Sequence, residues 1–221
     1  MIRVLYEDNH VLAVEKPVNV PVNPDSSLDE DLLTMCKAYL KEKYSKPGNV
    51  YLGLVHRLDR PVGGVMIFAK TSKAASRLSD QIRRNAVKKE YLAVTDGIVR
   101  QRQGTLCDYL VKDEKTNTVT VTAAGKGKKS ILHYEVPDEK DGMSLVHITL
   151  ETGRAHQIRV QFASRGYPLV CDQRYNPHAS KGQIALHAWR ITFEHPVKKE
   201  PVTVTCAPPQ TYPWNRFEVK E

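Results

Sequence analysis

Short apolar runs separated by polar, glycine or proline residues recur along the whole chain. The clearest pair covers residues 52–55 and 65–69, on either side of a charged segment at 56–60, with Pro61 and Gly63-Gly64 just behind it. Apolar runs of this length, bounded by glycine and proline, are typical of buried strands. The same patterns predict further strands at residues 2–6, 11–15, 87–94, 104–111, 118–122, 131–136, 144–150, 184–193 and 202–206.

Three segments carry helical spacing or capping signals instead. Ser27-Leu28-Asp29-Glu30 fits a capping box and predicts a helix over about residues 28–44. Thr71-Ser72 is expected to cap a second helix that ends near residue 85, and a short third helix is expected from Thr152-Gly153 to Gly166. Many hairpins with few helices are compatible with a mixed α+β fold, although the pattern alone does not prove one.

The charge balance is the unusual feature of the composition. A chain of 221 residues is long enough for one domain or a closely packed pair. Lys and Arg number 33 against 25 Asp and Glu, which gives a net charge of +8. Such an excess favours a polyanionic partner, most often nucleic acid, although many basic proteins bind nothing of the kind.

The cysteines and the N-terminal sequence bear on the cellular compartment. The four cysteines show neither a CxxC nor a Cys/His metal-ligand spacing, so we expect reduced thiols rather than a zinc site or a disulfide framework. Residues 1–10 lack a signal-peptide pattern, and no apolar run reaches membrane-spanning length. We therefore expect a cytoplasmic protein that does not associate with a membrane.

The charged segment between the two apolar runs reads His56-Arg57-Leu58-Asp59-Arg60. Because both neighbouring runs are predicted to be buried, these charges are expected to be withdrawn from bulk water. An aspartate flanked by two arginines should be held in its ionised form. Two interpretations remain open, an ion pair that pins a strand corner or an active carboxylate.

A second basic group follows the helix predicted after residue 71. Arg77, Arg83 and Arg84 lie on its far side, and Lys88 and Lys89 come directly after it. Five cations this close together suit a surface that follows the phosphates of a nucleic acid. The alternative is an ordinary solvated helix end.

Four motifs in the chain resemble those of one known family. The segment HRLDRPVGG (residues 56–64) resembles the HRLDxxTSG signature of the RluA family of RNA pseudouridine synthases. TGRAHQIRVQ and GYPLVCDQRY (152–161 and 166–175) resemble the family's TGRxHQIRVH and GxPLxGDxxY blocks, KKEYLAV its middle motif, and IALHAWRITFEHP its closing block. These motifs occur in the family's order, and the opening LYEDNHVLAVEKPVNV resembles the family's usual beginning.

The resemblance implies a fold and an activity. The implied fold is α+β, with a central, mainly antiparallel sheet, flanking helices and a basic active-site cleft, forming a single catalytic domain over residues 1–221 without the family's optional N-terminal RNA-binding domain. The implied reaction isomerises uridine to pseudouridine in structured RNA, either ribosomal or transfer RNA. It requires no cofactor and no metal, and we expect a monomer without an obligatory protein partner.

By motif position, Asp59 is the catalytic carboxylate. It could attack C1′ of the ribose or remove a proton from C2′, and the sequence does not separate these roles. Arg159 is the expected partner that keeps Asp59 charged and oriented, with Arg154 and Arg57 as alternatives.

Other site residues follow from the same resemblance. Tyr91 is expected to pack its ring on the uracil, with its hydroxyl as a candidate base at C5, and Leu186 to form an apolar wall of the base pocket. The target uridine must be extruded from the RNA, and Arg57 is the candidate to fill the vacated stack. His56 is expected in the site wall. The residues expected to bind substrate are thus Arg57, His56, Arg154, Leu186, Arg84, Lys88 and Lys89.

Three departures from the family motifs are local. Val62-Gly63 replaces a Thr-Ser pair, Gln161 replaces a histidine, and Cys171 replaces a glycine. None removes a charged catalytic group, but they affect turn packing and could affect the choice of RNA site. Two rival functions remain, a non-catalytic RNA-binding module or chaperone on the same scaffold, and a hydrolase that uses an aspartate and a histidine.

Overall fold

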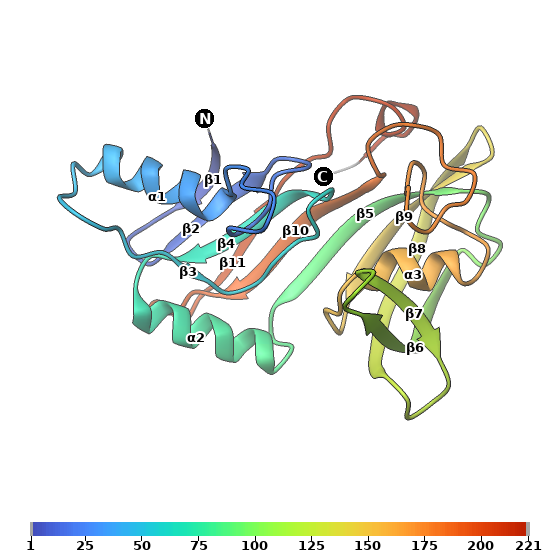
Figure 1. Cartoon of the computed structure of the whole chain (residues 1–221), viewed down its shortest axis with the longest axis horizontal. Coiled ribbons are helices and arrows are strands. Elements are labelled where there is room, and N and C mark those ends of the chain that lie inside the picture. Colours follow the sequence, from blue (N-terminus) through green and yellow to red (C-terminus); the bar gives the residue numbers. More distant parts are fainter. Residues whose placement is uncertain (1, 220–221) are drawn as a thin grey trace. The chain divides into compact units, whose positions relative to one another are not determined.

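The computed structural model describes residues 2–219 (Figure 1). The chain forms two compact units, each of which is described by itself. Unit 1 comprises the chain up to Lys88 together with Ala188–Cys206. Unit 2 comprises Lys89–His187 and the chain from Ala207 onward.

The central strands of unit 1 bury their apolar residues, whereas most apolar residues of its outer strands are half-buried. The strand order is β1-β2-β4-β10, in which β11 pairs with β10 and β3 pairs with β4. The pairings β1–β2, β2–β4, β3–β4 and β10–β11 are antiparallel. Every residue of β4 is buried, which accounts for its continuous apolar sequence. The strands are β1 (Arg3–Glu7), β2 (Val11–Lys16), β3 (Gly53–Leu54), β4 (Gly63–Ala69), β10 (Leu186–Glu194, of which residues 188–194 lie in this unit) and β11 (Pro201–Thr205).

Two helices accompany these strands, and the start of the first one differs from the prediction. Helix α1 (Leu32–Lys43) begins after Asp31, whose side chain accepts a hydrogen bond from the backbone N–H of Thr34. The predicted capping box at Ser27 is therefore wrong, because Asp31 satisfies the first-turn donor and Leu28 instead lies exposed with a φ of 62°. Helix α2 (Ser72–Arg83) begins after Thr71 as predicted, and it packs against β3 and β4.

Unit 2 contains an antiparallel sheet in the order β5-β9-β8-β6-β7. Its inward positions alternate with exposed ones, as in the pattern of β8, because one face of such a sheet packs on the core while the other meets water. The strands are β5 (Lys88–Asp96, of which residues 89–96 lie in this unit), β6 (Gln103–Asp113), β7 (Thr118–Thr122), β8 (Lys128–Lys140) and β9 (Met143–Leu150).

Helix α3 (Gln157–Ala163) packs against β6 and β7 and lies across the strands of unit 2 in Figure 1. Phe162 is buried and meets the Tyr134 ring edge-on, with ring centroids 5.4 Å apart. The helix starts later than predicted from Thr152-Gly153, because Thr152 lies in a bend, Ala155 and His156 form a turn, and His156 adopts a left-handed φ of 49°. A short 3-10 helix, η1 (Trp214–Arg216), lies near the end of the unit.

The mixed α+β architecture with mainly antiparallel strands is confirmed. The predicted strands are present within a few residues of their expected ends, apart from residues 52–55, of which only Gly53–Leu54 pair. No helix within residues 2–219 is long and apolar enough to cross a membrane.

Gly64 is the position in unit 1 where a side chain is least tolerable. Its φ of 120° is rarely adopted by other residues, and an added Cβ would lie 2.2 Å from the backbone oxygen of Ala188. We expect Gly64→Ala to lower the free energy of unfolding by more than about 3 kcal/mol, measured by urea denaturation. Gly142→Ala is the control, since nothing lies within 4 Å of its Cβ and only its φ of 75° opposes the change. A loss at Gly64 no larger than at Gly142 would contradict the close approach.

Candidate active site

The charged segment of residues 56–60 lies between β3 and β4 in unit 1. The backbone carbonyl of Asp59 accepts a hydrogen bond from the N–H of Val62 at 3.0 Å, so a tight turn follows the aspartate directly. Asp59 itself is half-buried. The expectation that the charges of this segment are withdrawn from water is wrong for the two arginines, because Arg57 and Arg60 are exposed.

Arg60 ties the turn to the loop before α1. Its Nε donates to the carbonyl of Asn19 at 3.0 Å, and its guanidinium is paired with Asp29 and lies 3.6 Å from Asp25. These contacts draw the guanidinium toward the proline-rich loop that follows β2. Arg60 therefore has a structural task in holding that loop against the turn.

His56 is held by the neighbouring strand. Its Nε2 accepts a hydrogen bond from the backbone N–H of Ile67 at 3.0 Å, which fixes the ring against β4. Among the residues that the structure describes, no three His, Cys, Asp or Glu side chains are grouped so that they could hold a metal ion.

Lys16 contacts the turn through its ammonium group. It is among the largest fully buried side chains of the described residues. It is the last residue of β2, and its ammonium donates hydrogen bonds to three backbone carbonyls. The acceptors are Pro17 at 2.9 Å, Arg60 at 2.9 Å and Val62 at 2.8 Å. Because two of these carbonyls bracket the turn that follows Asp59, Lys16 fixes the path of the backbone there.

The electrostatics of Lys16 involve Asp59 as well. Burial lowers the pKa of Lys16 to about 7, the negative charge of Asp59 acts to raise it, and the positive charge of Arg60 lowers it further. A lysine donates three hydrogen bonds only when it carries all three protons. The carbonyl arrangement therefore matches the ammonium form, which also places a positive charge near Asp59.

Val62 and Gly63, which depart from the family's Thr-Ser pair, fit this local packing. Val62 is buried. A Cβ at Gly63 would meet a γ-carbon of Val18 at 3.0 Å and the carbonyl of Lys16 at 3.3 Å. Val18 thus occupies space that a side chain at position 63 would need.

Arg159 in α3 forms the main buried ion pair of unit 2. Its Nε donates to Asp172 Oδ2 at 2.9 Å and its Nη2 to Asp172 Oδ1 at 2.7 Å, which is the two-pronged geometry that best suits a guanidinium and a carboxylate. The Arg159 guanidinium also lies over the ring of Tyr175, 5.1 Å from its centroid. These contacts hold the guanidinium in one plane.

Asp172 also organises the turn that carries Tyr175. Its Oδ1 accepts hydrogen bonds from the backbone N–H groups of Arg174 at 3.0 Å and Tyr175 at 3.2 Å. The Tyr175 hydroxyl accepts a bond from Val119 N–H at 2.8 Å and lies 2.7 Å from His156 Nδ1. The direction of the Tyr175–His156 hydrogen bond depends on the tautomer of the imidazole. The Tyr175 hydroxyl in either case ties β7 to the start of α3.

Cys171 and Gln161, the other two departures from the motifs, are both buried. Cys171 has a φ of 58°, a conformation that suits the glycine of the family motif, and Gly182 leaves room for its sulfur. The amide nitrogen of Gln161 donates to Asp108 Oδ2 at 2.7 Å. Its Oε1 has no hydrogen-bond partner within the described residues.

Tyr91 and Leu186 are buried strand residues of unit 2. Tyr91 lies in β5 opposite Ile148 of β9, and 9% of its surface is exposed. Leu186 is the first residue of β10. A buried tyrosine or leucine is found both in base pockets and in ordinary hydrophobic cores. The proposed roles of Tyr91 and Leu186 therefore stay predictions.

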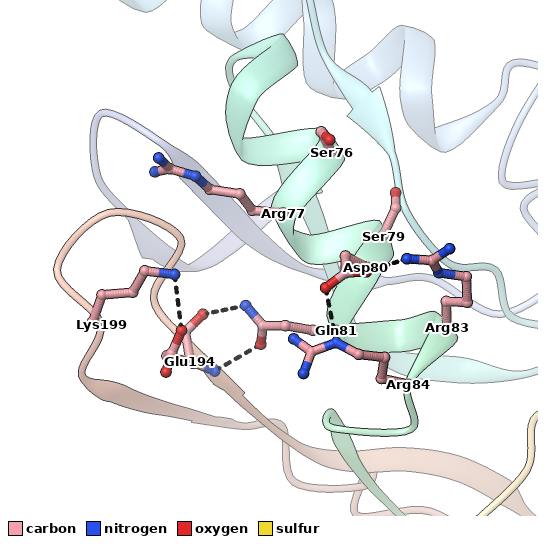
Figure 2. A pocket seen from close by; sticks show the side chains of 9 residues that line it. All are labelled: Ser76, Arg77, Ser79, Asp80, Gln81, Arg83, Arg84, Glu194 and Lys199. Carbon is pink, nitrogen blue, oxygen red and sulfur yellow. Dashed lines mark hydrogen bonds and ion pairs between the residues drawn. The ribbon is translucent and has the colours of Figure 1, made fainter.

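The expected phosphate-binding residues fall into two different surroundings. Arg83 and Arg84 at the end of α2 both pair with Asp80, the latter at 2.8 Å, and they line an open hollow of 560 Å³ (Figure 2). Lys88 is exposed. Lys89 is half-buried at the start of β5, near Arg154.

The two units divide the predicted site residues. Unit 1 holds five of them and unit 2 holds the other five. Within unit 1, His56, Arg57 and Asp59 are neighbours in the sequence. Within unit 2, Lys89 lies near Arg154. The pairing of Arg159 with Asp59 stays a prediction. The unit 1 residues are His56, Arg57, Asp59, Arg84 and Lys88; the unit 2 residues are Lys89, Tyr91, Arg154, Arg159 and Leu186.

The model of a protein family described as RNA pseudouridylate synthase matches residues 10–164, which include the Asp59 turn, Tyr91 and Arg159. The chain belongs to this family.

The curated relatives of this chain include ribosomal large subunit pseudouridine synthases of two types, C and D. A type C protein from Buchnera aphidicola is 32% identical over 213 residues, which cover 92% of this chain and 66% of the relative. A type D protein from Nitrosomonas europaea is 31% identical over 205 residues, which cover 88% of this chain and 58% of the relative. The chain thus spans less than two thirds of the length of these relatives.

Two solved human structures share the fold of this family member. Human RNA Pseudouridylate Synthase Domain Containing 4 aligns over 94% of this chain and 89% of its own, with a TM-score of 0.79 and 19% identity. Human RNA Pseudouridylate Synthase Domain Containing 1 aligns over 96% and 85%, with a TM-score of 0.77 and 22% identity. The α+β fold predicted from the motifs is therefore confirmed.

The sequence interpretation missed two residues that hold the site, Lys16 and Asp172. Lys16 ends a strand that begins with four buried apolar residues, and a charge at such a place signals a buried polar contact. Asp172 lies inside a motif already noted for its resemblance, but its pairing with Arg159 depends on a turn that sequence spacing does not reveal.

Replacing Lys16 should loosen the turn after Asp59. We expect Lys16→Met to lower the free energy of unfolding by about 2–4 kcal/mol, because the carbonyls of Arg60 and Val62 lose a buried donor. Hydrogen exchange at the Val62 amide should also become faster. Exposed Lys41→Met is the control and should change stability by less than about 0.5 kcal/mol. An unchanged Val62 exchange rate would contradict the supporting role of Lys16.

Replacing Asp172 should leave a buried arginine without its counter-charge. We expect Asp172→Asn to lower the free energy of unfolding by about 3–5 kcal/mol. Urea denaturation measures the effect, with Asp141→Asn as control, since Asp141 lies in an exposed hairpin turn with a φ of 52° that asparagine tolerates. Equal stability of the two variants would show that Arg159 does not depend on Asp172.

Proposed function

We propose that this protein isomerises uridine to pseudouridine in structured RNA, with ribosomal RNA as the first substrate to test. Membership of the RNA pseudouridylate synthase family carries the proposal. The printed names of the ribosomal large subunit relatives favour ribosomal over transfer RNA. The net charge of +8 is in keeping with an RNA partner.

In this proposal Asp59 acts at the ribose of a flipped-out uridine. The supporting observation is that its turn is held by Lys16, Arg60 and the Val62 N–H, so the backbone that carries the carboxylate has a defined path before substrate binds. Preorganisation of this kind reduces the free energy needed to reach the transition state. Attack at C1′ and proton removal at C2′ are both served by the ionised form.

Arg159 orients Asp59 in the proposed site, and Asp172 holds the guanidinium plane from one edge. Tyr91 lies against the uracil ring and offers its hydroxyl at C5, and Leu186 forms the apolar wall. The proposed reaction exchanges no electrons and needs no cofactor, since uracil is detached and rejoined to the same ribose.

Flipping of the uridine falls to Arg57 in the proposal. Its guanidinium is exposed and lies two residues before Asp59, so it can enter the space that the extruded base leaves. Extrusion of a base costs a few kcal/mol, about as much as one stacked guanidinium with backbone contacts can return. His56, whose ring is held by the hydrogen bond from the Ile67 N–H, forms part of the proposed site wall next to Arg57.

The broader setting is proposed with the activity. The protein would act as a monomer in the cytoplasm, where ribosomal RNA is available, with basic residues such as Arg84, Lys88 and Lys89 contacting the RNA backbone. These contacts would make its RNA affinity dependent on salt.

Tritium release from RNA labelled at uridine C5 tests the proposed function. The substrate is total RNA from cells that lack this protein, so that no target has to be guessed and the target is not already modified. We expect release by the wild type and at least a 1000-fold lower rate for Asp59→Asn, an order of magnitude typical of losing a group that acts in the chemical step. RNA affinity should change little, because asparagine keeps the volume of aspartate.

Asp141→Asn is the matched control for that experiment, since it removes the same charge at an exposed turn. It should release tritium at the wild-type rate. Release by neither the wild type nor the control would favour a non-catalytic RNA-binding protein. Release by Asp59→Asn at the wild-type rate would show that the catalytic residue has been misassigned.

A further inference from the structure

Lys89 and Arg154 place two positive charges beside one another in unit 2. Lys89 lies opposite Leu150 in the β5–β9 ladder, and the chain turns directly after Leu150 toward Arg154. The ammonium of Lys89 reaches this turn, since a Cβ added to Gly153 would lie 3.0 Å from Lys89 Nζ. The two cations therefore share one short stretch of surface.

Neither cation is neutralised by a side chain of the described residues. Within residues 2–219, the ammonium group of Lys89 makes no hydrogen bond and no ion pair, although the residue is half-buried. The guanidinium of Arg154 makes one hydrogen bond there, from Nε to the carbonyl of Lys129 at 3.3 Å, and has no carboxylate partner. Burial lowers the pKa of Lys89, and the charge of Arg154 lowers it further. Two like charges without a counter-ion are destabilising unless an anion binds.

The turn that carries Arg154 is fixed in advance. Gln157 Oε1 accepts hydrogen bonds from the Thr152 hydroxyl at 2.9 Å and from the Arg154 N–H at 3.0 Å. The Thr152 oxygen also accepts from the N–H of Ile131 at 2.8 Å. These bonds fix the backbone of residues 152–154, so that the position of Arg154 next to Lys89 does not have to form when an anion binds.

The basic end of α2 differs in this respect. Arg83 and Arg84 pair with Asp80, and Lys199 pairs with Glu194 at 3.0 Å (Figure 2). The C-terminal end of a helix also repels anions. Of the two basic clusters, the one formed by Lys89 and Arg154 is therefore better suited to a phosphate.

We propose that Lys89 and Arg154 together form one anion subsite that binds a single phosphate of the RNA backbone. The proposal rests on RNA as the proposed substrate. Bound between a compact ammonium and a planar guanidinium, the phosphate would fix the RNA strand against unit 2. The site accounts for both unpaired cations and for the prebuilt turn.

A double-mutant cycle tests whether the two residues share one phosphate. The probe is unmodified large-subunit ribosomal RNA transcribed in vitro, and its dissociation constant is measured over a range of potassium chloride concentrations. We expect Lys89→Met and Arg154→Met each to weaken binding about tenfold, and the double variant to weaken it little more than either single variant. Each variant, including the double, should reduce the slope of log affinity against log salt by about one.

Lys140→Met is the matched control, because Lys140 is an exposed cation opposite Met143 at the other end of β9 and the substitution removes the same charge. It should change the affinity less than about twofold, in line with loss of a distant screened charge. Lys89→Arg should keep most of the affinity, and unchanged thermal unfolding of the variants would show that folding is intact. A variant that unfolds would be replaced in the cycle by Lys89→Gln or Arg154→Gln.

Several results would overturn the proposal. Additive losses with a slope change of about two in the double variant would mean two separate phosphate contacts. Unchanged RNA affinity, together with stabilisation by inorganic phosphate that requires Lys89, would assign the site to free phosphate. Tritium release by the wild type is measured in parallel. Non-additive losses of RNA affinity without tritium release would support the phosphate subsite and overturn the proposed isomerase activity. Tritium release with additive losses of affinity would overturn the shared subsite and leave the proposed activity standing.

Discussion

The buried ammonium of Lys16 is the contact on which the candidate catalytic turn depends. It joins the end of β2 to the carbonyls of Arg60 and Val62, so the backbone after Asp59 follows a path set by three hydrogen bonds. Burying a charge is unfavourable unless it is fully hydrogen-bonded. The same contacts that offset that cost hold the aspartate's turn in place, and stability of unit 1 and geometry of the site are therefore linked.

Unit 2 uses a different device for a similar purpose. Asp172 holds the Arg159 guanidinium with two hydrogen bonds and caps the turn that carries Tyr175, so one carboxylate positions both the arginine and the aromatic ring over which it lies. Buried ion pairs are sensitive to the loss of either member. In each unit a buried polar contact holds the segment or side chain proposed for catalysis, the Asp59 turn in unit 1 and the Arg159 guanidinium in unit 2.

The basic side chains of the surface differ in whether a carboxylate of the protein is paired with them. Arg60 and Arg84 are engaged by carboxylates of their own unit, so much of their charge is already balanced. Arg57 is exposed, and Lys89 with Arg154 has no carboxylate partner in the described part of the chain. A net charge of +8 therefore says little about where RNA would bind, whereas the ion-pair pattern points to particular residues.

The sequence by itself determined the strands, α2, the α+β class and the family, because these follow from local periodicity, capping and motif order along the chain. It placed the start of α1 wrongly, since Ser27 and Asp31 both offer a capping oxygen and only the folded chain shows which one meets the first turn. Tertiary structure alone revealed the carbonyl cage of Lys16, the Arg159–Asp172 pair and the neighbouring charges of Lys89 and Arg154. Each of these joins residues separated along the chain, and no local pattern encodes such a contact, because it depends on strand register and on turns that form only when the chain folds.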